Sequence, residues 1–374
     1  MSRLEIKGVT KRYKKETVLD SVSLSVDEGK TLVLFGPSGA GKTVLLRLIA
    51  GVIDPDEGAI VIDDEDVTDV EAQDRRIGMA FQNFALFPHM TAFDNIASPL
   101  VAARLSTDEI RDGVGKVADL LKIGHVTSHM PRELSNGQKQ RTALARALVG
   151  EPPILLLDDP LRNVDAKLRF EMRLELPSLL RGRGTTVIYV TQDYKEAMAL
   201  GDQIAVLTEG VVTQHGTPAE IYLKPANIEI ARLFGDPVIN SFDVVPRAAD
   251  NDANAVCVEL SDTEIPLPYD AKQWIGNSCV FGIRPEYISF VAPGTAGSLP
   301  VNIEAETPIN EKIITLATTL GGRELLISRP AGTPGAHKEG AFVELKPDSG
   351  LLFDQASGKL LQGMGELAEP GAAA

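Results

Sequence analysis

Residues 36–43 are the segment whose residue types and spacing best suit binding chemistry. They fit the pattern G-x-x-x-x-G-K-[ST], in which glycines let backbone N–H groups close around phosphate oxygens. The lysine of such a loop reaches the β- and γ-phosphates of a nucleotide, and the hydroxyl side chain binds Mg²⁺. The pattern therefore predicts a triphosphate-binding loop made of Gly36, Pro37, Ser38, Gly39, Ala40, Gly41, Lys42 and Thr43.

Asp158 is a second candidate, because it follows four apolar residues at 154–157. A short apolar run of this kind is typical of a buried strand, and open α/β sheets bind ligands at the carboxyl ends of their strands. We expect Asp158 to hold Mg²⁺ through water beside the glycine-rich loop. Many buried strands end in aspartate, so this motif carries weight only together with that loop.

The elements that must position these residues lie within 1–235, where strand-like and helix-like patterns alternate. Ser106 and Glu109 match a capping box, which predicts the start of a helix. Such alternation implies a mostly parallel α/β sheet. The glycine-rich loop lies between a predicted strand and a predicted helix, which disfavours a chance glycine-rich turn. The expected strands are 31–35, 154–157 and 185–191, the expected helices 42–50 and 106–121, and the expected hairpin 204–212.

A second domain is expected at 236–362, because the pattern changes near residues 235–237. Short β-like runs separated by Gly, Pro and Asn turns are typical of small all-β barrels. The last residues, 363–374, are expected to form a disordered tail. The β-like runs are 254–260, 279–283, 301–305, 312–317, 324–328 and 341–345.

Composition limits the classes of protein to which the chain can belong. Its 374 residues allow about two domains, and its net charge of −15 argues against nonspecific nucleic-acid binding. Two cysteines, Cys257 and Cys279, cannot form a disulfide framework, so we expect buried thiols in a reducing compartment. The amino terminus lacks the apolar region of a secretion signal, and no stretch approaches 18 uncharged apolar residues. We therefore expect that the chain does not cross a membrane.

Residues 134–138, Leu-Ser-Asn-Gly-Gln, resemble the signature motif of the ATP-binding cassette (ABC) ATPases, usually LSGGQ. A plain helix start is the alternative, since Ser135 and Gln138 also match a capping box, and both interpretations can hold. The resemblance implies that Ser135, Asn136, Gly137 and Gln138 clamp the γ-phosphate of ATP bound by the opposite subunit.

Other positions match the family in order along the chain. The resemblance implies that Tyr13 stacks on adenine, although an isolated tyrosine is more often a packing residue. It implies that Gln82 senses Mg²⁺ and the attacking water, with a buried structural glutamine as the alternative, and that residues 82–91 contact membrane subunits. Asp165 matches the aspartate of the D-loop. The implied metal set is Thr43, Gln82 and Asp158, and the implied catalytic set is Asp159, Gln82 and Gln192.

The resemblance extends over nearly the whole chain and is greatest to ATPase subunits of maltose-type importers. It implies a P-loop NTPase fold, with a RecA-like core and an ABC helical subdomain, followed by an OB-like (TOBE) barrel that is regulatory in the family. Residues 235–240 and 281–286 resemble segments of that barrel and favour sugars or polyols over polyamines, iron and oxyanions as the solute. The implied cofactors are ATP and Mg²⁺. The implied partners are two transmembrane permease subunits, an extracytoplasmic solute-binding protein and a second ATPase subunit, at the cytoplasmic face of the membrane.

Four positions depart from the family pattern. Asp159 stands where a glutamate usually polarises the attacking water, and it is one methylene shorter. Gln192 replaces the switch histidine, and a carboxamide cannot carry the proton or charge of an imidazole. Arg162 replaces the serine of the D-loop. Asn136 replaces the first glycine of the signature, a milder change because asparagine tolerates positive φ.

The departures affect hydrolysis more than binding, since Lys42, Thr43, Gln82 and Asp158 are present. Binding and chemistry are separable terms, so we expect a loop that holds ATP and cleaves it slowly. Paired losses of this kind resemble the degenerate half of an asymmetric ATPase pair, which predicts a heterodimer with a second, more standard ATPase. Two alternatives remain: a homodimer that uses Asp159 as its catalytic carboxylate, and a nucleotide-binding regulatory subunit with little turnover. A soluble cassette that acts on DNA or ribosomes is disfavoured, because the chain has one cassette and no heptads.

Overall fold

The computed structural model describes residues 2–162, 166–181, 184–249, 252–261, 263–267, 271–295, 297–333, 340–346 and 349–363. The chain divides into two compact units, Met1–Pro218 and Ala219–Ala374. The sequence analysis places the domain boundary after residue 235, whereas the first unit of the structure ends at Pro218. The helices α7 (Pro218–Leu223) and α8 (Ile228–Leu233) therefore lie almost entirely in the second unit.

The first unit contains a six-stranded sheet with the order β10-β9-β3-β8-β7-β6. Strand β3 pairs in parallel with β8 and β9, and β7 pairs in parallel with β6 and β8, while β10 pairs antiparallel with β9. This confirms the predicted parallel sheet, its three strands and the hairpin. The strands are β3 (Thr31–Phe35), β6 (Ile77–Ala80), β7 (Ile154–Asp158), β8 (Thr186–Thr191), β9 (Gln203–Thr208) and β10 (Val211–Gly216).

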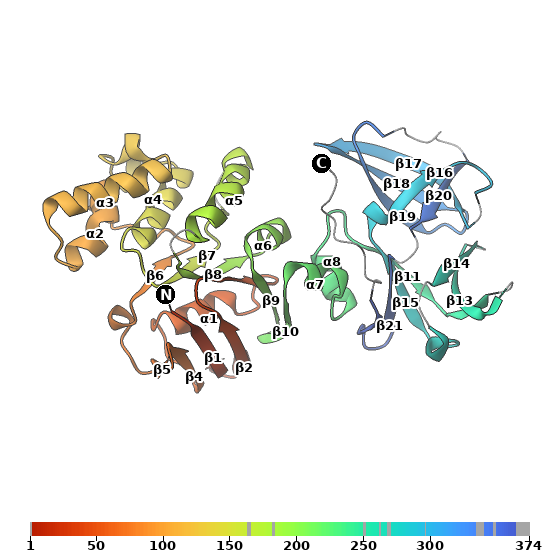
Figure 1. Cartoon of the computed structure of the whole chain (residues 1–374), viewed down its shortest axis with the longest axis horizontal. Coiled ribbons are helices and arrows are strands. Elements are labelled where there is room, and N and C mark those ends of the chain that lie inside the picture. Colours follow the sequence, from red (N-terminus) through yellow and green to blue (C-terminus); the bar gives the residue numbers. More distant parts are fainter. Residues whose placement is uncertain are drawn as a thin grey trace. The chain divides into compact units, whose positions relative to one another are not determined.

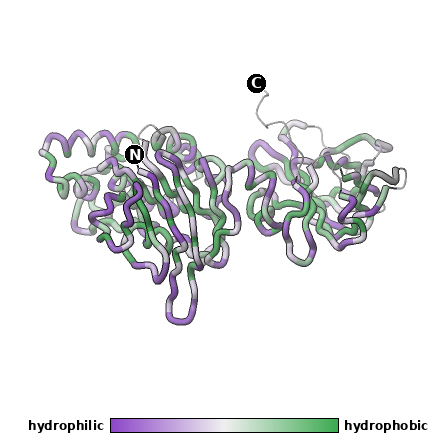
Figure 2. The backbone as a smooth tube through the Cα atoms, turned by 60° about the horizontal axis from the view of Figure 1, so that its bottom comes forward, coloured by the Kyte–Doolittle hydropathy of each residue, from purple (hydrophilic) through white to green (hydrophobic). Residues whose placement is uncertain are grey.

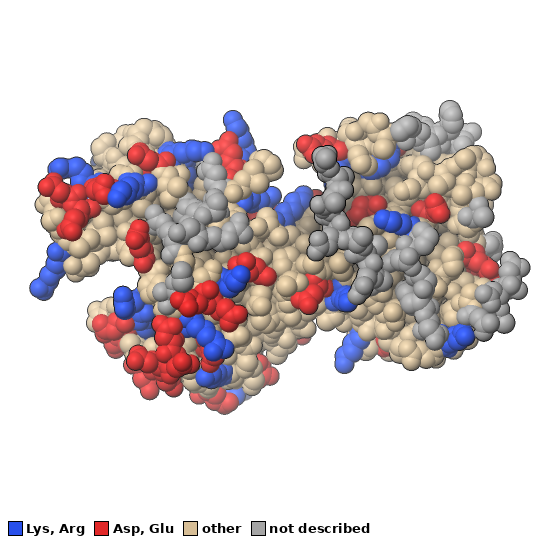
Figure 3. Space-filling view, viewed as in Figure 1, with Lys and Arg blue, Asp and Glu red and all other residues tan. Residues whose placement is uncertain are grey.

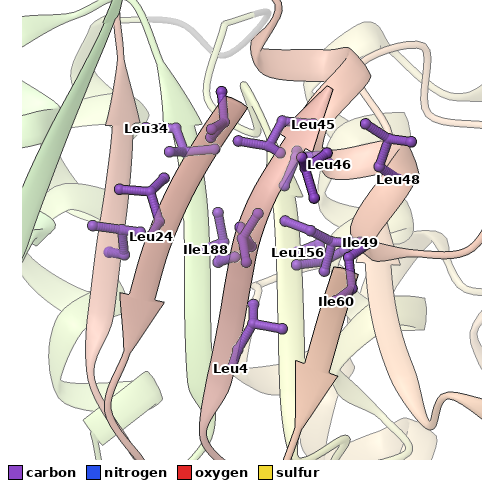
Figure 4. Packing of buried hydrophobic residues seen from close by; sticks show 14 of the residues in the cluster. Leu4, Leu24, Leu34, Leu45, Leu46, Leu48, Ile49, Ile60, Leu156 and Ile188 are labelled. Carbon is purple, nitrogen blue, oxygen red and sulfur yellow. The ribbon is translucent and has the colours of Figure 1, made fainter. Parts of the chain in front are cut away.

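A second sheet of the first unit is antiparallel, with the order β2-β1-β4-β5, and the sequence patterns did not predict it. Helix α1 (Lys42–Ile49) contributes leucines to a core that both sheets share, as Figure 4 shows. There Leu4 and Ile60 from the antiparallel sheet lie near Leu156 and Ile188 from the parallel one. This core therefore holds the amino end of α1, and with it the glycine-rich loop, between two sheets. The strands are β1 (Leu4–Tyr13), β2 (Glu16–Val26), β4 (Glu57–Ile62) and β5 (Glu65–Asp66).

Helices α2, α3 and α4 gather on one side of the first unit (Figure 1). Thr91, Ser106 and Ser135 begin these three helices, each as part of a capping box in which side chain and backbone bond reciprocally. The predicted capping box at Ser106 is confirmed, and the three helices form the expected helical subdomain. The helices are α2 (Ala92–Ala102), α3 (Thr107–Leu120), α4 (Asn136–Leu148), α5 (Ala166–Arg181) and α6 (Tyr194–Leu200).

The second unit is rich in β-strands, which form three sheets around one apolar core. Their orders are β11-β15-β21-β22, β12-β13-β14 and β16-β20-β17-β18-β19. All six predicted β-like runs are strands. The strands are β11 (Asn240–Val244), β12 (Arg247–Ala249), β13 (Asp252–Leu260), β14 (Thr263–Leu267), β15 (Cys279–Ile283), β16 (Ile288–Val291), β17 (Leu299–Ile309), β18 (Lys312–Thr319), β19 (Glu324–Pro330), β20 (Ala341–Leu345), β21 (Gly350–Asp354) and β22 (Leu360–Gln362).

Arg284 explains why α7 and α8 belong to the second unit. Its side chain is 1% exposed and donates from Nη2 to the carbonyl of Tyr222 at 2.7 Å. Nη1 donates to the carbonyls of Ala231 and Phe234, and the guanidinium lies 3.6 Å from the centre of the Tyr222 ring. A buried guanidinium needs several acceptors, and here the ends of two short helices supply them.

The distributions of hydropathy and charge agree with this architecture. Figure 2 shows hydrophobic stretches running mainly through the interior of each unit. Cys257 and Cys279 are buried thiols that are not joined in a disulfide, as predicted. Carboxylates gather near β4 and β5 in Figure 3, a face that would repel polyanions. Among the described residues, no helix combines the length and the apolar character needed to cross a membrane.

Candidate functional site

The glycine-rich loop connects the end of β3 to the start of α1, as predicted. Gly36 has a φ of 154°, and a Cβ at this position would collide with the carbonyl oxygen of Leu207. Gly41 has a φ of 99°, and a Cβ there would lie 2.7 Å from a methyl group of Leu19. Only glycine fits both positions, because each needs a positive φ and close approach of neighbouring atoms. The conformation of the loop therefore requires glycine at both positions, and the sequence pattern G-x-x-x-x-G places glycine there.

Lys42 begins α1 and points back into the loop. Its Nζ donates to the carbonyls of Gly36 at 2.7 Å and Pro37 at 2.6 Å, and the residue is 6% exposed. Burial lowers the pKa of Lys42, while the charges of Asp159 and Asp158 oppose that shift. The ammonium group is thus held ready in a concave loop, where phosphate oxygens would be stronger acceptors than the two carbonyls.

Thr43 and Asp158 meet across the end of the parallel sheet. The Thr43 hydroxyl donates to Oδ1 of Asp158 at 3.2 Å, and Asp158 is 3% exposed. Burial raises the pKa of Asp158, and the hydrogen bond from Thr43 partly lowers it. Gln82 lines the same cavity. A hydroxyl, a carboxylate and an amide oxygen fit Mg²⁺, which prefers oxygen ligands and takes few protein carboxylates when phosphates bind it too.

Asp159 follows directly and has an unusual backbone. Its φ is 49°, in the left-handed region. Its N–H donates to the carbonyl of Val190 at 3.0 Å, and its carbonyl accepts from Nε2 of Gln140 at 3.2 Å. Burial raises the pKa of Asp159, while the positive charge of Arg162 lowers it. Neighbouring elements therefore hold this residue in a conformation that aims its carboxylate at the cavity.

Gln192 reaches the glycine-rich loop from the end of β8. Its Oε1 accepts from the hydroxyl of Ser38 at 3.3 Å. Asp193 caps α6 immediately afterwards, and Arg173 donates to Asp193 at 2.6 Å. These contacts fix the backbone on which Gln192 is carried.

One cavity of about 250 Å³ brings most of the predicted residues together. Val18 and Arg162 also line it, although no sequence pattern predicts either residue at the nucleotide site. In the sequence Arg162 is only a departure from the family pattern, and its exposed side chain carries no periodic signal. The predicted residues at the cavity are Ser38, Gly39, Gly41, Lys42, Thr43, Gln82, Asp158, Asp159 and Gln192.

Other predicted residues lie away from this cavity. The Tyr13 ring is about half exposed, with Nζ of Lys11 at 5.6 Å from its centre. Ser135 and Gln138 form the capping box of α4, and Asn136 and Gly137 occupy its first turn. In the described part of the chain, none of these five lines the cavity that contains Lys42. Asp165 lies outside the described residues.

Comparison with known proteins identifies the family. Residues 19–162 match the family model described as ABC transporter. The chain is 42% identical to the sn-glycerol-3-phosphate import ATP-binding protein UgpC of Yersinia pseudotuberculosis, over 81% of this chain and 84% of that protein. It is 37% identical to the trehalose/maltose import ATP-binding protein MalK of Thermococcus litoralis, over 96% of this chain and all of that protein.

A solved structure agrees with the sequence relatives. It is the dimeric, post-hydrolysis state of an ATP-binding cassette bound to ADP and Pi, with 34% identity and a TM-score of 0.55. The aligned region spans 57% of this chain and 98% of the chain in the solved structure. The loop, the cavity and these relatives together establish that the chain belongs to the ABC transporter family, as the ATP-binding subunit of an importer and an ABC ATPase.

Proposed function

We propose that this chain powers the uptake of a sugar, a polyol or a polyol phosphate. The observation that carries the proposal is its similarity, over most of its length, to import subunits named for trehalose/maltose and for sn-glycerol-3-phosphate. The test is ATP hydrolysis by the purified transporter in the presence of its solute-binding protein. We expect stimulation by one of these solutes, and stimulation only by polyamines, iron or oxyanions would refute the proposed solute class.

The cavity residues have separate roles in nucleotide binding. Lys42 exchanges its two carbonyl acceptors for phosphate oxygens of ATP. Thr43, Gln82 and Asp158 would hold Mg²⁺, which would neutralise part of the phosphate charge. Gln192, which already bonds Ser38, lies where it could hydrogen-bond the terminal phosphate or the attacking water.

Hydrolysis at this site is slow in our proposal. Asp159 offers a carboxylate at the cavity, but its side chain is one methylene shorter than glutamate, and Arg162 lies 3.6 Å away. Gln192 offers a hydrogen bond without a transferable proton. Misplacing a catalytic group by roughly 1 Å can cost about a hundredfold in rate. The site thus combines intact binding groups with altered groups for chemistry.

A transporter with one slowly hydrolysing site can still work if a second ATPase subunit supplies a site that hydrolyses ATP fast. Ser135, Asn136 and Gly137 lie away from this chain's own cavity, so they are free to complete the site of a partner cassette. The related solved cassettes are dimers. We therefore propose a heterodimer in which this chain lends its signature helix to a partner with a standard catalytic glutamate.

A homodimer is the second candidate, and one observation favours it. The Asp159 carboxylate lines the cavity, and burial raises its pKa, as a general base requires. In that case Asp159 would be the working catalytic carboxylate, and hydrolysis would proceed with Gln192 in place of the switch histidine. A regulatory subunit with little turnover would use the same binding residues.

The permease subunits dock, in our proposal, on a groove of about 880 Å³ beside α2. Phe87 and Leu105 line it and are each about two-fifths exposed. Asn95 of α2, fully buried, fixes the adjacent segment by bonds to both backbone groups of Phe87 and to the carbonyls of Met90 and Thr91. An apolar groove with rigid walls suits a helix of a membrane protein. This arrangement would hold the chain at the cytoplasmic face of the membrane.

The second unit is proposed to be the regulatory TOBE domain of the family. Its three sheets share one buried core, which gives it a fold independent of the nucleotide site. Removal of the whole second unit, residues 219–374, should therefore leave nucleotide binding intact while changing how uptake responds to cellular signals.

Subunit composition decides between the two dimers. A tag on this chain, followed by mass spectrometry of the intact transporter, counts the cassettes. One copy of this chain with one different ATPase would support the heterodimer. Two copies of this chain without another ATPase would overturn it and make Asp159 the catalytic carboxylate.

A further inference from the structure

Arg162 occupies an unusual place for a long cationic side chain. It lines the cavity that holds Lys42 and also two adjoining hollows, one beside Gln82 and one beside Asp193. Its backbone is held from both sides, because its N–H donates to the Asp159 carbonyl at 3.3 Å and its carbonyl accepts from Arg169 at 3.1 Å. The guanidinium therefore projects from a fixed point into the region where the hollows meet.

The guanidinium is only loosely engaged where it lies. Its Nη1 is 3.6 Å from Oδ2 of Asp159, which is longer than a hydrogen bond, and the Arg162 side chain is 51% exposed. A partly exposed ion pair of this length contributes little to stability. A phosphate with two negative charges would be a stronger acceptor than the single carboxylate.

The charges of the cavity give Arg162 a role. The charged residues at its wall are Lys42 and Arg162, which are positive, and Asp158 and Asp159, which are negative. Arg162 thus supplies one of the two positive side chains at the wall that can pair with phosphate oxygens. Gln192 is uncharged and already accepts a hydrogen bond from Ser38, so it adds no positive charge.

We propose that Arg162 binds the terminal phosphate of ATP in this chain's own cavity and so makes the site prefer ATP over ADP. On this view the guanidinium leaves Asp159 when the γ-phosphate arrives and returns when only a diphosphate is present. Arg162 is then the residue by which a slow site retains triphosphate. The inference rests on the proposed nucleotide binding by Lys42 and Thr43.

The test measures equilibrium binding of fluorescent ATP and ADP analogues to the full-length chain, with Mg²⁺ and in EDTA. Arg162→Gln should weaken ATP binding about tenfold and ADP binding less than twofold, because charge-assisted bonds to phosphate are stronger than neutral ones. Arg162→Lys should restore part of the ATP affinity. The loss for Arg162→Gln should be larger in EDTA, where no metal ion shares the phosphate charge.

Arg232→Gln is the matched control. Arg232 is 46% exposed and pairs with Glu229 three residues earlier at 2.7 Å, in the second unit. This variant loses the same charge and should leave both affinities unchanged. Equal losses of ATP and ADP affinity in Arg162→Gln would overturn the inference, because a general charge effect or a folding defect would explain them.

Two further outcomes separate this inference from the proposed function. If the wild-type chain binds ATP and Arg162→Gln binds it equally well, the inference is wrong and nucleotide binding stands. If the wild-type chain binds neither nucleotide, the proposed function and the inference both fail.

Discussion

Restoring the standard catalytic residues should convert the slow site into a faster one. The change is Asp159→Glu with Gln192→His. The added methylene moves the carboxylate toward the cavity by roughly 1 Å, a displacement that can be worth about a hundredfold in rate. That factor corresponds to about 2.7 kcal/mol of transition-state stabilisation. We expect a rise of at least about tenfold, because Arg162 still lies beside residue 159 and withholds part of the gain.

The assay is phosphate release by the reconstituted transporter under single-turnover conditions. If a second ATPase is present, the P-loop lysine of that partner is replaced, so that only this chain's site is measured. Asp108→Glu is the matched control, because Asp108 also pairs with an arginine three residues later, Arg111 at 3.5 Å, but lies on the exposed surface of α3. It should not change the rate. Unchanged or reduced phosphate release in the double variant would refute the view that the two departures slow this site.

Three other substitutions test separate parts of the structure. Lys42→Ala should abolish measurable binding of ATP analogues, because it removes the ammonium group from the loop; retained binding would exclude the proposed site. Asp159→Asn should raise the Tm of the nucleotide-free protein at pH 7. Burial raises the folded-state pKa of Asp159, so the ionised carboxylate opposes folding, and the Tm difference from wild type should shrink as the pH falls through that pKa. A difference independent of pH would contradict this. Arg284→Leu should destabilise the second unit by about 3 kcal/mol, because it leaves buried carbonyls without a donor; calorimetry should show that only one of two transitions moves.

Local patterns were sufficient to predict the elements that carry the chemistry. The apolar run Thr31–Phe35 and the glycines after it are confirmed as β3 and the loop before α1. Strands of a parallel sheet are buried on both faces and are therefore continuous apolar runs, which makes them easy to identify in the sequence. The antiparallel sheet was missed because β1 contains Gly8 and several charged residues among its apolar ones, with irregular pairing near Val9.

The remaining features depend on contacts between residues far apart in the chain. Arg162 lies at the cavity because the chain turns after Asp159, and although Pro160 favours a turn, the sequence does not indicate that this turn carries Arg162 to the nucleotide site. The unit boundary depends on Arg284, which bonds to carbonyls fifty or more residues earlier. The roles of Tyr13, Ser135 and the other signature residues stay predictions, since their expected partners are a nucleotide and a second subunit.

The hydrogen bond from Gln140 to the Asp159 carbonyl has a mechanical consequence for the whole transporter. Gln140 is buried in α4, and Ser135 begins the same helix. A partner's nucleotide that shifts this helix would strain the backbone of Asp159, and occupancy of this chain's cavity would in turn bias the position of the helix. Thermodynamic linkage requires that the two effects be equal. If this chain's site hydrolyses ATP slowly, as proposed, its occupancy can then still change the affinity of the neighbouring site for nucleotide.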